Sequence, residues 1–201
     1  MATVDSETLD RARRNDRAAL AEVWRIYHPQ LLRFLRSQQA PSVDDVASEV
    51  WIDVGRAIAR FDGDGRAFQR WLFTIASRRA VDEHRRAARR PAPLEDADSE
   101  RRVDSSAAAD QGLDDGVDEA IALLRRLPPN MAAVVMLRAV HGLTVAETAA
   151  VLGCSQANVR VLAHRGLGRL RSFLDTERPV LRSVAPETAH TAVPFGQGAD
   201  V

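Results

Sequence analysis

Apolar residues recur at intervals of three and four along most of this chain, which is the spacing that the buried face of an α-helix requires. Residues 17–38 carry such a stripe, which includes Val23 and Tyr27, and Pro29 predicts a kink or break within it. A shorter helix precedes it, with Ser6 as the expected N-cap. No stretch shows the strict alternation of a half-buried strand, so the pattern predicts an all-α fold.

Two further helices are predicted before residue 90. Residues 41–61 begin with Ser42 in a capping position and keep their apolar side chains on one stripe. The sequence Asp-Gly-Asp-Gly at 62–65 then predicts a turn, because glycine and aspartate favour turns. A helix resumes after it and ends in a dense arginine cluster near residue 90.

The helical pattern is lost twice along the chain. Residues 91–116 hold many acidic and small residues and few large apolar ones, which predicts a flexible linker. Residues 176–201 contain three prolines and no apolar period, which predicts a disordered tail. The whole chain is therefore expected to form two small helical domains, 1–90 and 117–175, joined by a flexible acidic linker.

Residues 143–171 contain two apolar stripes separated by Gly-Cys-Ser, which is the pattern of a helix-turn-helix. Such a motif needs a small residue where its helices touch and a residue that tolerates a positive φ in the turn. Ala149 and Gly153 fit these two positions. Val159 fits the inward face of the second helix, and Ser155 is placed to cap that helix.

The exposed face of this second helix carries side chains that suit contact with DNA. Arginine can bridge guanine in the major groove, and glutamine or asparagine can bridge adenine. The candidates are Gln156, Asn158, Arg160, His164 and Arg165. An ordinary helical hairpin with a solvated basic face would show the same spacing, so the motif alone leaves both interpretations open.

The formal net charge of zero conceals an uneven distribution of charge. Residues 11–90 hold 17 arginines against 10 acidic residues, whereas residues 91–120 hold 2 arginines against 10. Residues 121–175 return to a basic excess, with 7 arginines against 2 acidic residues. Two basic blocks joined by an acidic connector favour the DNA-binding interpretation.

Other classes of function find little support in the sequence. No apolar run approaches the roughly 18 residues of a membrane span, and the N-terminus lacks the apolar stretch of a secretory signal. No nucleophile lies beside a plausible base, so we expect no enzyme, no catalytic residue and no small-molecule substrate. The histidines are too scattered for a zinc site, and we expect no metal or cofactor. Cys154 is expected to pack as a small apolar residue rather than to act as a redox switch.

Two segments of the chain carry motifs of a known protein family. Residues 127–171 contain Leu-Pro-Pro, Gly-Leu-Thr, Glu147, Leu-Gly and His-Arg in the order seen in a promoter-binding domain. Residues 42–86, and more loosely 18–36, match that family's N-terminal domain. The chain thus resembles bacterial RNA polymerase sigma factors of the sigma-70 family, in the extracytoplasmic-function (ECF) group, from residue 6 to residue 174.

The resemblance implies two DNA-binding surfaces. A sigma-4-like C-terminal domain would place its recognition helix on the minus-35 promoter element. A sigma-2-like N-terminal domain would grip the minus-10 element, where one base is held out of the stack. The residues implied at the minus-35 element are Gln156, Asn158, Arg160, His164, Arg165 and Arg169. Those implied at the minus-10 element are Arg66, Ser77, Arg78, Arg79, His84, Arg85 and Arg86.

The resemblance also implies protein partners. In this family the helix that holds Asp45, Glu49 and Trp51 docks on core RNA polymerase, on its beta and beta-prime subunits. These residues are the expected polymerase contacts, although the two acids would equally fit a solvated face. An anti-sigma factor is a further expected partner. The implied location is the cytoplasm, or the inner membrane face when an anti-sigma factor holds the protein there.

Some interpretations stay open at the level of sequence. Phe68, Trp71 and Phe73 could stack on bases, but their helical spacing and apolar neighbours favour core packing. The acidic linker either mimics nucleic acid inside the polymerase channel or only stays soluble and extended.

The implied function is a promoter-specificity subunit that directs core polymerase to promoters and assists melting. The alternatives are a self-sufficient helix-turn-helix regulator that needs no polymerase, and a sigma-like decoy that does not read DNA.

Overall fold

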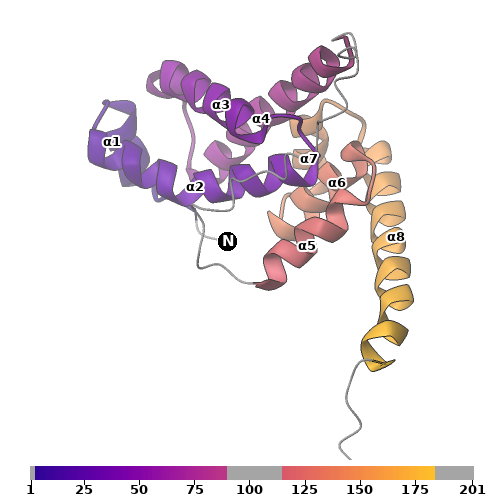
Figure 1. The fold of residues 1–201 in the computed structure, drawn as a ribbon. Helices are drawn as coiled ribbons and strands as arrows, with labels where there is room; N and C mark the ends of the chain where they lie inside the picture. Colours follow the sequence, from indigo (N-terminus) through magenta and orange to yellow (C-terminus); the bar gives the residue numbers. More distant parts are fainter. Residues whose placement is uncertain (1–2, 90–114, 184–201) are drawn as a thin grey trace, which may run out of the picture.

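A computed structural model describes residues 3–89 and 115–183 of the chain. Every regular element in these two ranges is a helix, which confirms the all-α fold class (Figure 1). The helices form an N-terminal group, α1 to α4, and a C-terminal group, α5 to α8. Nearly all of the predicted linker falls at 90–114, outside the described residues, so its flexibility remains a prediction.

The N-terminal group forms where the apolar stripes predict it. Its elements are α1 (Ser6–Arg13), α2 (Arg17–Ser37), α3 (Val43–Ala57), the short 3-10 helix η1 (Ile58–Arg60) and α4 (Gly65–Arg89). The prediction that Ser6 caps the first helix is wrong by one residue. Asp5 is the N-cap, and its carboxylate accepts a hydrogen bond of 2.8 Å from the Thr8 backbone N–H. Aspartate is at least as good a cap as serine.

The helix α2 continues through Pro29, so a break at this residue is excluded. Proline removes one backbone hydrogen bond from a helix interior. Tyr27 and Leu31, on either side of Pro29, are fully buried and fix both halves of the helix against the core. Tertiary packing therefore outweighs the local cost of the proline.

Aromatic side chains fill the core of the N-terminal group. The rings of Tyr27 and Phe68 lie 5.0 Å apart, and those of Phe34 and Phe73 lie 4.9 Å apart. The Tyr27 hydroxyl donates a hydrogen bond of 2.9 Å to the Gly65 carbonyl, where α4 begins. Phe68 and Phe73 are fully buried, which confirms core packing for both.

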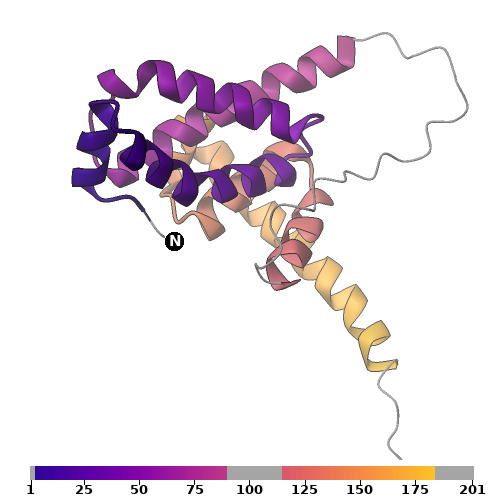
Figure 2. The ribbon, with the colours of Figure 1, turned by 60° about the vertical axis from the view of Figure 1, so that its left-hand side comes forward.

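The C-terminal group contains α5 (Asp115–Arg125), α6 (Pro129–Val135), a π-helical turn η3 (Met136–Val140), α7 (Val145–Leu152) and α8 (Gln156–Ser183). The last helix runs past Asp175, where the sequence pattern predicts its end, and includes Pro179. One proline removes one backbone hydrogen bond and does not have to end a helix. The end of α8 projects from the body (Figures 1 and 2), and residues 184–201 lie outside the described part.

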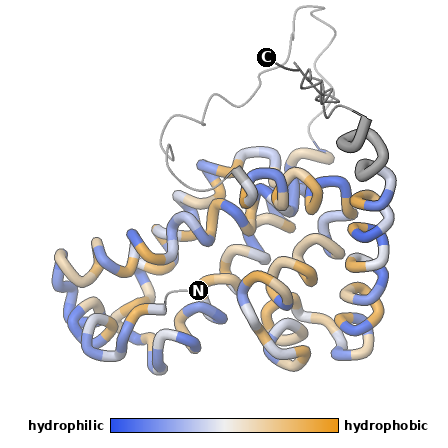
Figure 3. The backbone as a smooth tube through the Cα atoms, turned by 90° about the horizontal axis from the view of Figure 1, so that it is seen from below, coloured by the Kyte–Doolittle hydropathy of each residue, from blue (hydrophilic) through white to orange (hydrophobic). Residues whose placement is uncertain are grey.

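The two groups pack against each other. α4 lies along α7, while α2 contacts α5 and α6. Most of the buried apolar side chains form one continuous cluster that includes both Phe73 and Leu137. Apolar segments of the tube accordingly face inward from both groups (Figure 3). The described residues thus form a closed arrangement in which the two predicted domains share a core.

A glycine allows the close approach of α8 to α6. A Cβ atom at Gly166 would lie 2.7 Å from Val135 Cγ2 and 2.9 Å from Met131 Cγ. Such distances require side chains in a packed core to move. Gly168, two residues later on the same helix, has nothing within 4 Å of the equivalent position.

We expect Gly166→Ala to destabilise the fold by about 1–3 kcal/mol, because overpacking a core has this cost. Gly168→Ala is the matched control and should stabilise the fold by up to about 1 kcal/mol, because alanine is the better helix former. Urea denaturation followed by circular dichroism measures both. Equal effects of the two substitutions would show that α8 does not pack on α6 through Gly166.

Candidate nucleic-acid interface

The helix-turn-helix is built by local hydrogen bonds that its sequence supplies. The Thr144 hydroxyl accepts the Glu147 backbone N–H at 3.2 Å, and the Glu147 carboxylate accepts the Thr144 N–H at 2.7 Å, which forms a capping box. Gly153 ends α7 with a φ of 62°. Ser155 then caps α8 by accepting the Asn158 N–H at 3.2 Å. The predicted turn at Gly153 and the predicted Ser155 cap are therefore confirmed, and the capping box of α7 is an additional feature.

A small apolar cluster holds the second helix of the motif in place. Val159 is fully buried and groups with Ala149 from α7 and Val134 from α6. Leu162 and Cys154 pack against this cluster from partly buried positions. The N-terminal part of α8 is therefore fixed on one side and open to solvent on the other.

The residues predicted at the minus-35 element all lie exposed on α8. Residues four apart in a helix share a face, so Gln156, Arg160 and His164 form one row. The second row, Asn158, Arg165 and Arg169, lies on the other flank of the buried stripe. Arg160 donates to Gln156 at 3.4 Å within the first row. The helix thus presents one polar row on each flank of its buried stripe, and both rows are accessible to the major groove of DNA.

The residues predicted at the minus-10 element do not form one free surface. Arg79 pairs with α3, with its Nε 2.8 Å from Asp53 Oδ2 and its Nη1 3.1 Å from Glu49 Oε2. Arg86 lies 3.7 Å from the same Glu49 carboxylate and 3.2 Å from Glu83. The His84 ring nitrogen Nε2 lies 3.1 Å from the Gln38 carbonyl.

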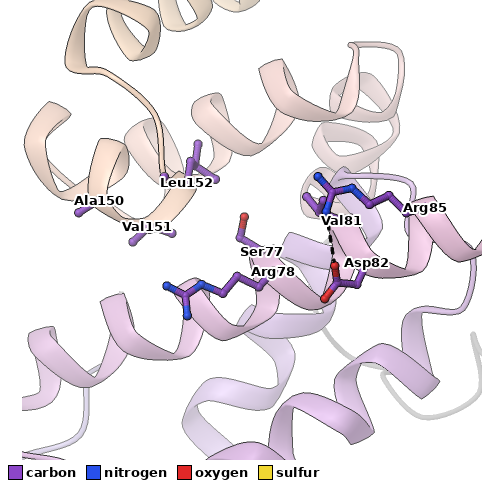
Figure 4. A pocket seen from close by; sticks show the side chains of 9 residues that line it. Ser77, Arg78, Val81, Asp82, Arg85, Ala150, Val151 and Leu152 are labelled. Carbon is purple, nitrogen blue, oxygen red and sulfur yellow. Dashed lines mark ion pairs between the residues drawn. The ribbon is translucent and has the colours of Figure 1, made fainter.

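Three other minus-10 candidates line a cavity between α4 and α7. Ser77, Arg78 and Arg85 share this cavity of about 400 Å³ with Val81 and Asp82 of α4, residues 150–152 of α7 and the Gly153 that follows it (Figure 4). Ser77 is buried, while Arg78 and Arg85 are exposed. Arg85 also lies 3.8 Å from Asp82. The α7 helix therefore faces the part of α4 on which DNA contacts are predicted.

Arg66, the remaining minus-10 candidate, contacts the C-terminal group directly. Its guanidinium lies 2.9 Å from the Glu147 carboxylate of α7. Arg70, one turn further along α4, lies 2.8 Å from the same carboxylate. Spacing along the chain gives no signal for such a pair, because its partners are far apart in sequence.

The residues predicted to contact polymerase divide between two sides of α3. Asp45 is exposed, and Glu49 lies one turn further along the same face, beside α4. Trp51 instead faces α2, and its indole N–H donates to His28 Nδ1 at 3.1 Å. The His28 ring also stacks on exposed Trp24, with 4.4 Å between ring centroids.

His141 is a buried polar residue that the sequence pattern does not single out. It is 7% exposed, its ring lies 4.3 Å from that of Phe73, and neither ring nitrogen has a hydrogen-bond partner among the described residues. Burial lowers the pKa of His141 to about 4, and the nearby charge of Arg33 acts in the same direction. The imidazole is therefore neutral where the two helical groups meet.

The described residues offer no other obvious site. No helix among them is long and apolar enough to span a membrane. No cluster of three or more histidine, cysteine or acidic side chains within residues 3–89 and 115–183 is arranged to hold a metal ion.

Comparison with known protein families matches both helical groups. Residues 23–90 match the family described as Sigma-70 region 2, and residues 118–170 match the family described as Sigma-70, region 4. The ECF RNA polymerase sigma factor ShbA of Streptomyces griseus is 35% identical over 184 residues, which cover 86% of this chain and 96% of ShbA. The chain belongs to the sigma-70 family of sigma factors, in its ECF group.

Further relatives support this assignment. The ECF RNA polymerase sigma factor SigD of Mycobacterium tuberculosis is 34% identical over 180 residues, covering 84% of this sigma factor and 85% of SigD. Two solved structures show the same fold. One is CnrH in complex with the cytosolic domain of CnrY, with a TM-score of 0.57, 24% identity, and coverage of 86% of this chain and 98% of CnrH.

The second structure is the sigma factor RpoE in complex with the anti-sigma factor NepR from Bartonella quintana. It has a TM-score of 0.59 and 21% identity, and it covers 77% of this chain and 96% of RpoE. At these identities the likeness concerns the fold. The recognition of an ECF sigma factor from its motifs is confirmed, and an independent helix-turn-helix regulator is not favoured.

We expect His141 to make the stability of this sigma factor depend on pH. In the unfolded chain the imidazole is exposed and has an ordinary pKa near 6.5, whereas in the folded protein its pKa is about 4. The unfolded state therefore binds a proton first as the pH decreases from 6.5 towards 4, and the free energy of unfolding falls in this range. The loss between pH 7.5 and pH 5 should be about 2 kcal/mol.

His141→Leu should remove this component of the pH dependence, because the variant has no imidazole to protonate. Urea denaturation of both proteins at pH 7.5 and pH 5 measures the difference. The same loss of stability in the variant as in the native protein would contradict the assignment to His141.

Proposed function

We propose that this sigma factor binds core RNA polymerase, directs it to specific promoters and assists promoter melting, without catalysing a reaction itself. The observation that carries the proposal is the exposed polar face of α8, held by a complete helix-turn-helix. The proposed domains are a sigma-2-like body at 1–90 and a sigma-4-like body at 117–175. The proposed linker is 91–116, the α8 extension to Ser183 follows the second body, and the remaining tail is outside the described part.

The minus-35 element is the proposed ligand of α8. Asn158 and Arg165 carry the amide and guanidinium groups that can bridge adenine and guanine. Gln156 and Arg160 offer the same chemistry from the other row. Arginines and histidine further along α8 are proposed to position the helix through phosphates, which carry no sequence information.

The minus-10 element is the proposed ligand of α4. Arg78 supports this best, because it is exposed at the cavity and has no ion pair within residues 3–89 and 115–183. Arg66 and Arg85 lie on the same side of the helix, toward α7. Arg79 and Arg86 form ion pairs with α3. Their proposed role is therefore to shape the basic surface rather than to bind DNA phosphates directly.

Core polymerase is the proposed partner of α3, through Asp45, Glu49 and the partly buried Trp51. An anti-sigma factor is a further proposed partner, because the similar sigma factor RpoE was solved in complex with the anti-sigma factor NepR. The proposed location is the cytoplasm, where polymerase and promoter DNA are found.

We expect Asn158→Ala and Arg165→Ala each to reduce promoter-dependent run-off transcription with purified core enzyme. The loss of one bidentate base contact costs about 1–3 kcal/mol, which corresponds to about 5- to 150-fold at limiting sigma factor. A genomic fragment library supplies the promoters, and Arg14→Ala, an exposed arginine between α1 and α2, is the control.

The pattern of results separates the candidate functions. Absence of specific start sites with the native protein would contradict the proposed function. Unchanged transcription in both α8 variants would favour a decoy that binds polymerase without reading DNA. Binding of the native protein to promoter fragments as specifically without core enzyme as with it would favour a self-sufficient regulator.

A further inference from the structure

One carboxylate joins the two proposed DNA-binding bodies. Glu147 of α7 accepts two hydrogen bonds from Arg66, from Nη2 at 2.9 Å and from Nε at 3.1 Å. It accepts a third from Arg70 Nη1 at 2.8 Å. Arg66 also approaches the Gly142 carbonyl at 3.4 Å. The bidentate geometry makes this the form of arginine–carboxylate pairing with the best-defined orientation.

The Glu147 carboxylate also caps the N-terminus of α7. Glu147 Oε2 accepts the Thr144 backbone N–H and closes the capping box of α7. The cap fixes the orientation of the Glu147 side chain before any arginine approaches it. The Glu147 side chain is 19% exposed, and its hydrogen bonds from Arg66 are the leading cause of a lowered pKa. It is therefore a pre-oriented anion at ordinary pH.

A ring contact and a hydrogen bond extend the contact between the two bodies beyond the ion pairs. Phe73 of α4 packs on His141, which precedes α7. The Gln39 amide, which follows α2, donates to the Leu127 carbonyl, which precedes α6, at 3.2 Å. The ion pairs lie at one end of this joint, and the cavity lined by Ser77 and Arg78 lies further along α4. The contact between the bodies is thus continuous along α4.

In the closed arrangement, the Arg66 guanidinium is already paired with Glu147. A guanidinium that binds a carboxylate bidentately cannot give the same N–H groups to a phosphate. The proposed function assigns Arg66 to promoter DNA, whereas the closed arrangement gives it to Glu147. The α7 helix also faces the side of α4 that holds Arg78 and Arg85. Closure therefore competes with minus-10 binding for the guanidinium group of Arg66.

We propose that Glu147 is an intramolecular latch, which imitates a DNA phosphate and keeps the free sigma factor closed by occupying Arg66 and Arg70. This inference rests on the proposed function, because it needs α4 to be a DNA-binding surface. Binding to core polymerase and promoter DNA then has to separate the two bodies.

The latch is suited to reversible opening. Arg66 is 53% exposed and Arg70 is 37% exposed, so water and salt reach both ion pairs. Exposed ion pairs contribute little individually and weaken as ionic strength rises. Two arginines on one fixed carboxylate hold the joint at low salt, while a polyanion such as DNA can compete for them.

The test is Glu147→Gln. Glutamine at this position retains the capping box, so α7 should stay folded, while the charge that holds Arg66 and Arg70 is lost. We expect the variant to bind a fluorescent mixed-sequence single-stranded DNA at least about 5-fold more tightly than the native protein at low salt, a typical size for such coupling. Fluorescence anisotropy measures this affinity in the absence of polymerase.

Glu119→Gln is the matched control for total charge. Glu119 is an exposed acid of α5 without an ion pair in the described part of the chain, and its substitution changes the net charge by the same amount. Equal affinities for Glu147→Gln and Glu119→Gln would overturn the latch, because the gain would then reflect net charge alone. So would an affinity of Glu147→Gln that equals that of the native protein.

A charge exchange tests the contact without depending on DNA binding. Glu147→Arg should increase the radius of gyration measured by small-angle X-ray scattering. Adding Arg66→Glu and Arg70→Glu to this variant should restore the compact value, because the attraction is recreated with reversed signs. Both proteins lack the capping box, so the comparison isolates the ion pairs. An expanded triple variant, or no expansion in the single variant, would contradict the latch.

Failure of the latch and failure of the proposed function are distinguishable. Run-off transcription by the native protein with core enzyme tests the function and does not require a closed free state. If transcription is specific but Glu147→Gln and the charge exchange show no effect, the latch alone is wrong. If transcription is absent, the proposed function fails first.

Discussion

The Glu147 carboxylate receives hydrogen bonds from the Thr144 backbone, Arg66 and Arg70, and this shared acceptor links local folding to the arrangement of the two bodies. The capping box orients the carboxylate, and the carboxylate joins α4 to α7 through Arg66 and Arg70. This arrangement decides which proposed DNA surface is accessible. The polar face of α8 is exposed to solvent, while α7 covers part of α4. A single anion thus affects both helix stability and access to DNA.

Several arginines of the basic N-terminal block are paired with acidic side chains inside the folded chain. Arg79 and Arg86 are held by acids of α3 and α4, and Arg66 and Arg70 are held by Glu147. The number of arginines in the block therefore overstates the number of guanidinium groups that are free to contact phosphates in the closed protein. Separation of the two bodies would release Arg66 and Arg70 but leave Arg79 paired.

Local patterns predict the elements whose causes are local. The helical stripes, the turn at Gly153, the Ser155 cap and the buried Val159 all follow from residues within a few positions of each other. Contacts such as those of Glu147 with Arg66, or of His141 with Phe73, have no local signature. These contacts depend on how the two bodies pack against each other. The end of α8 is also not predictable, because a proline removes one backbone hydrogen bond and the remaining hydrogen bonds can still continue the helix.

The most direct test of this account is the distance between the two bodies in free and bound protein. Spin labels at Arg14→Cys and Asp118→Cys, in a Cys154→Ala background, report that distance by pulsed electron resonance. Arg14 and Asp118 are exposed, one in each body. The account predicts one short distance for the free sigma factor and a longer one in the complex with core polymerase and promoter DNA. The same distance in both states, or a long distance in the free protein, would contradict it.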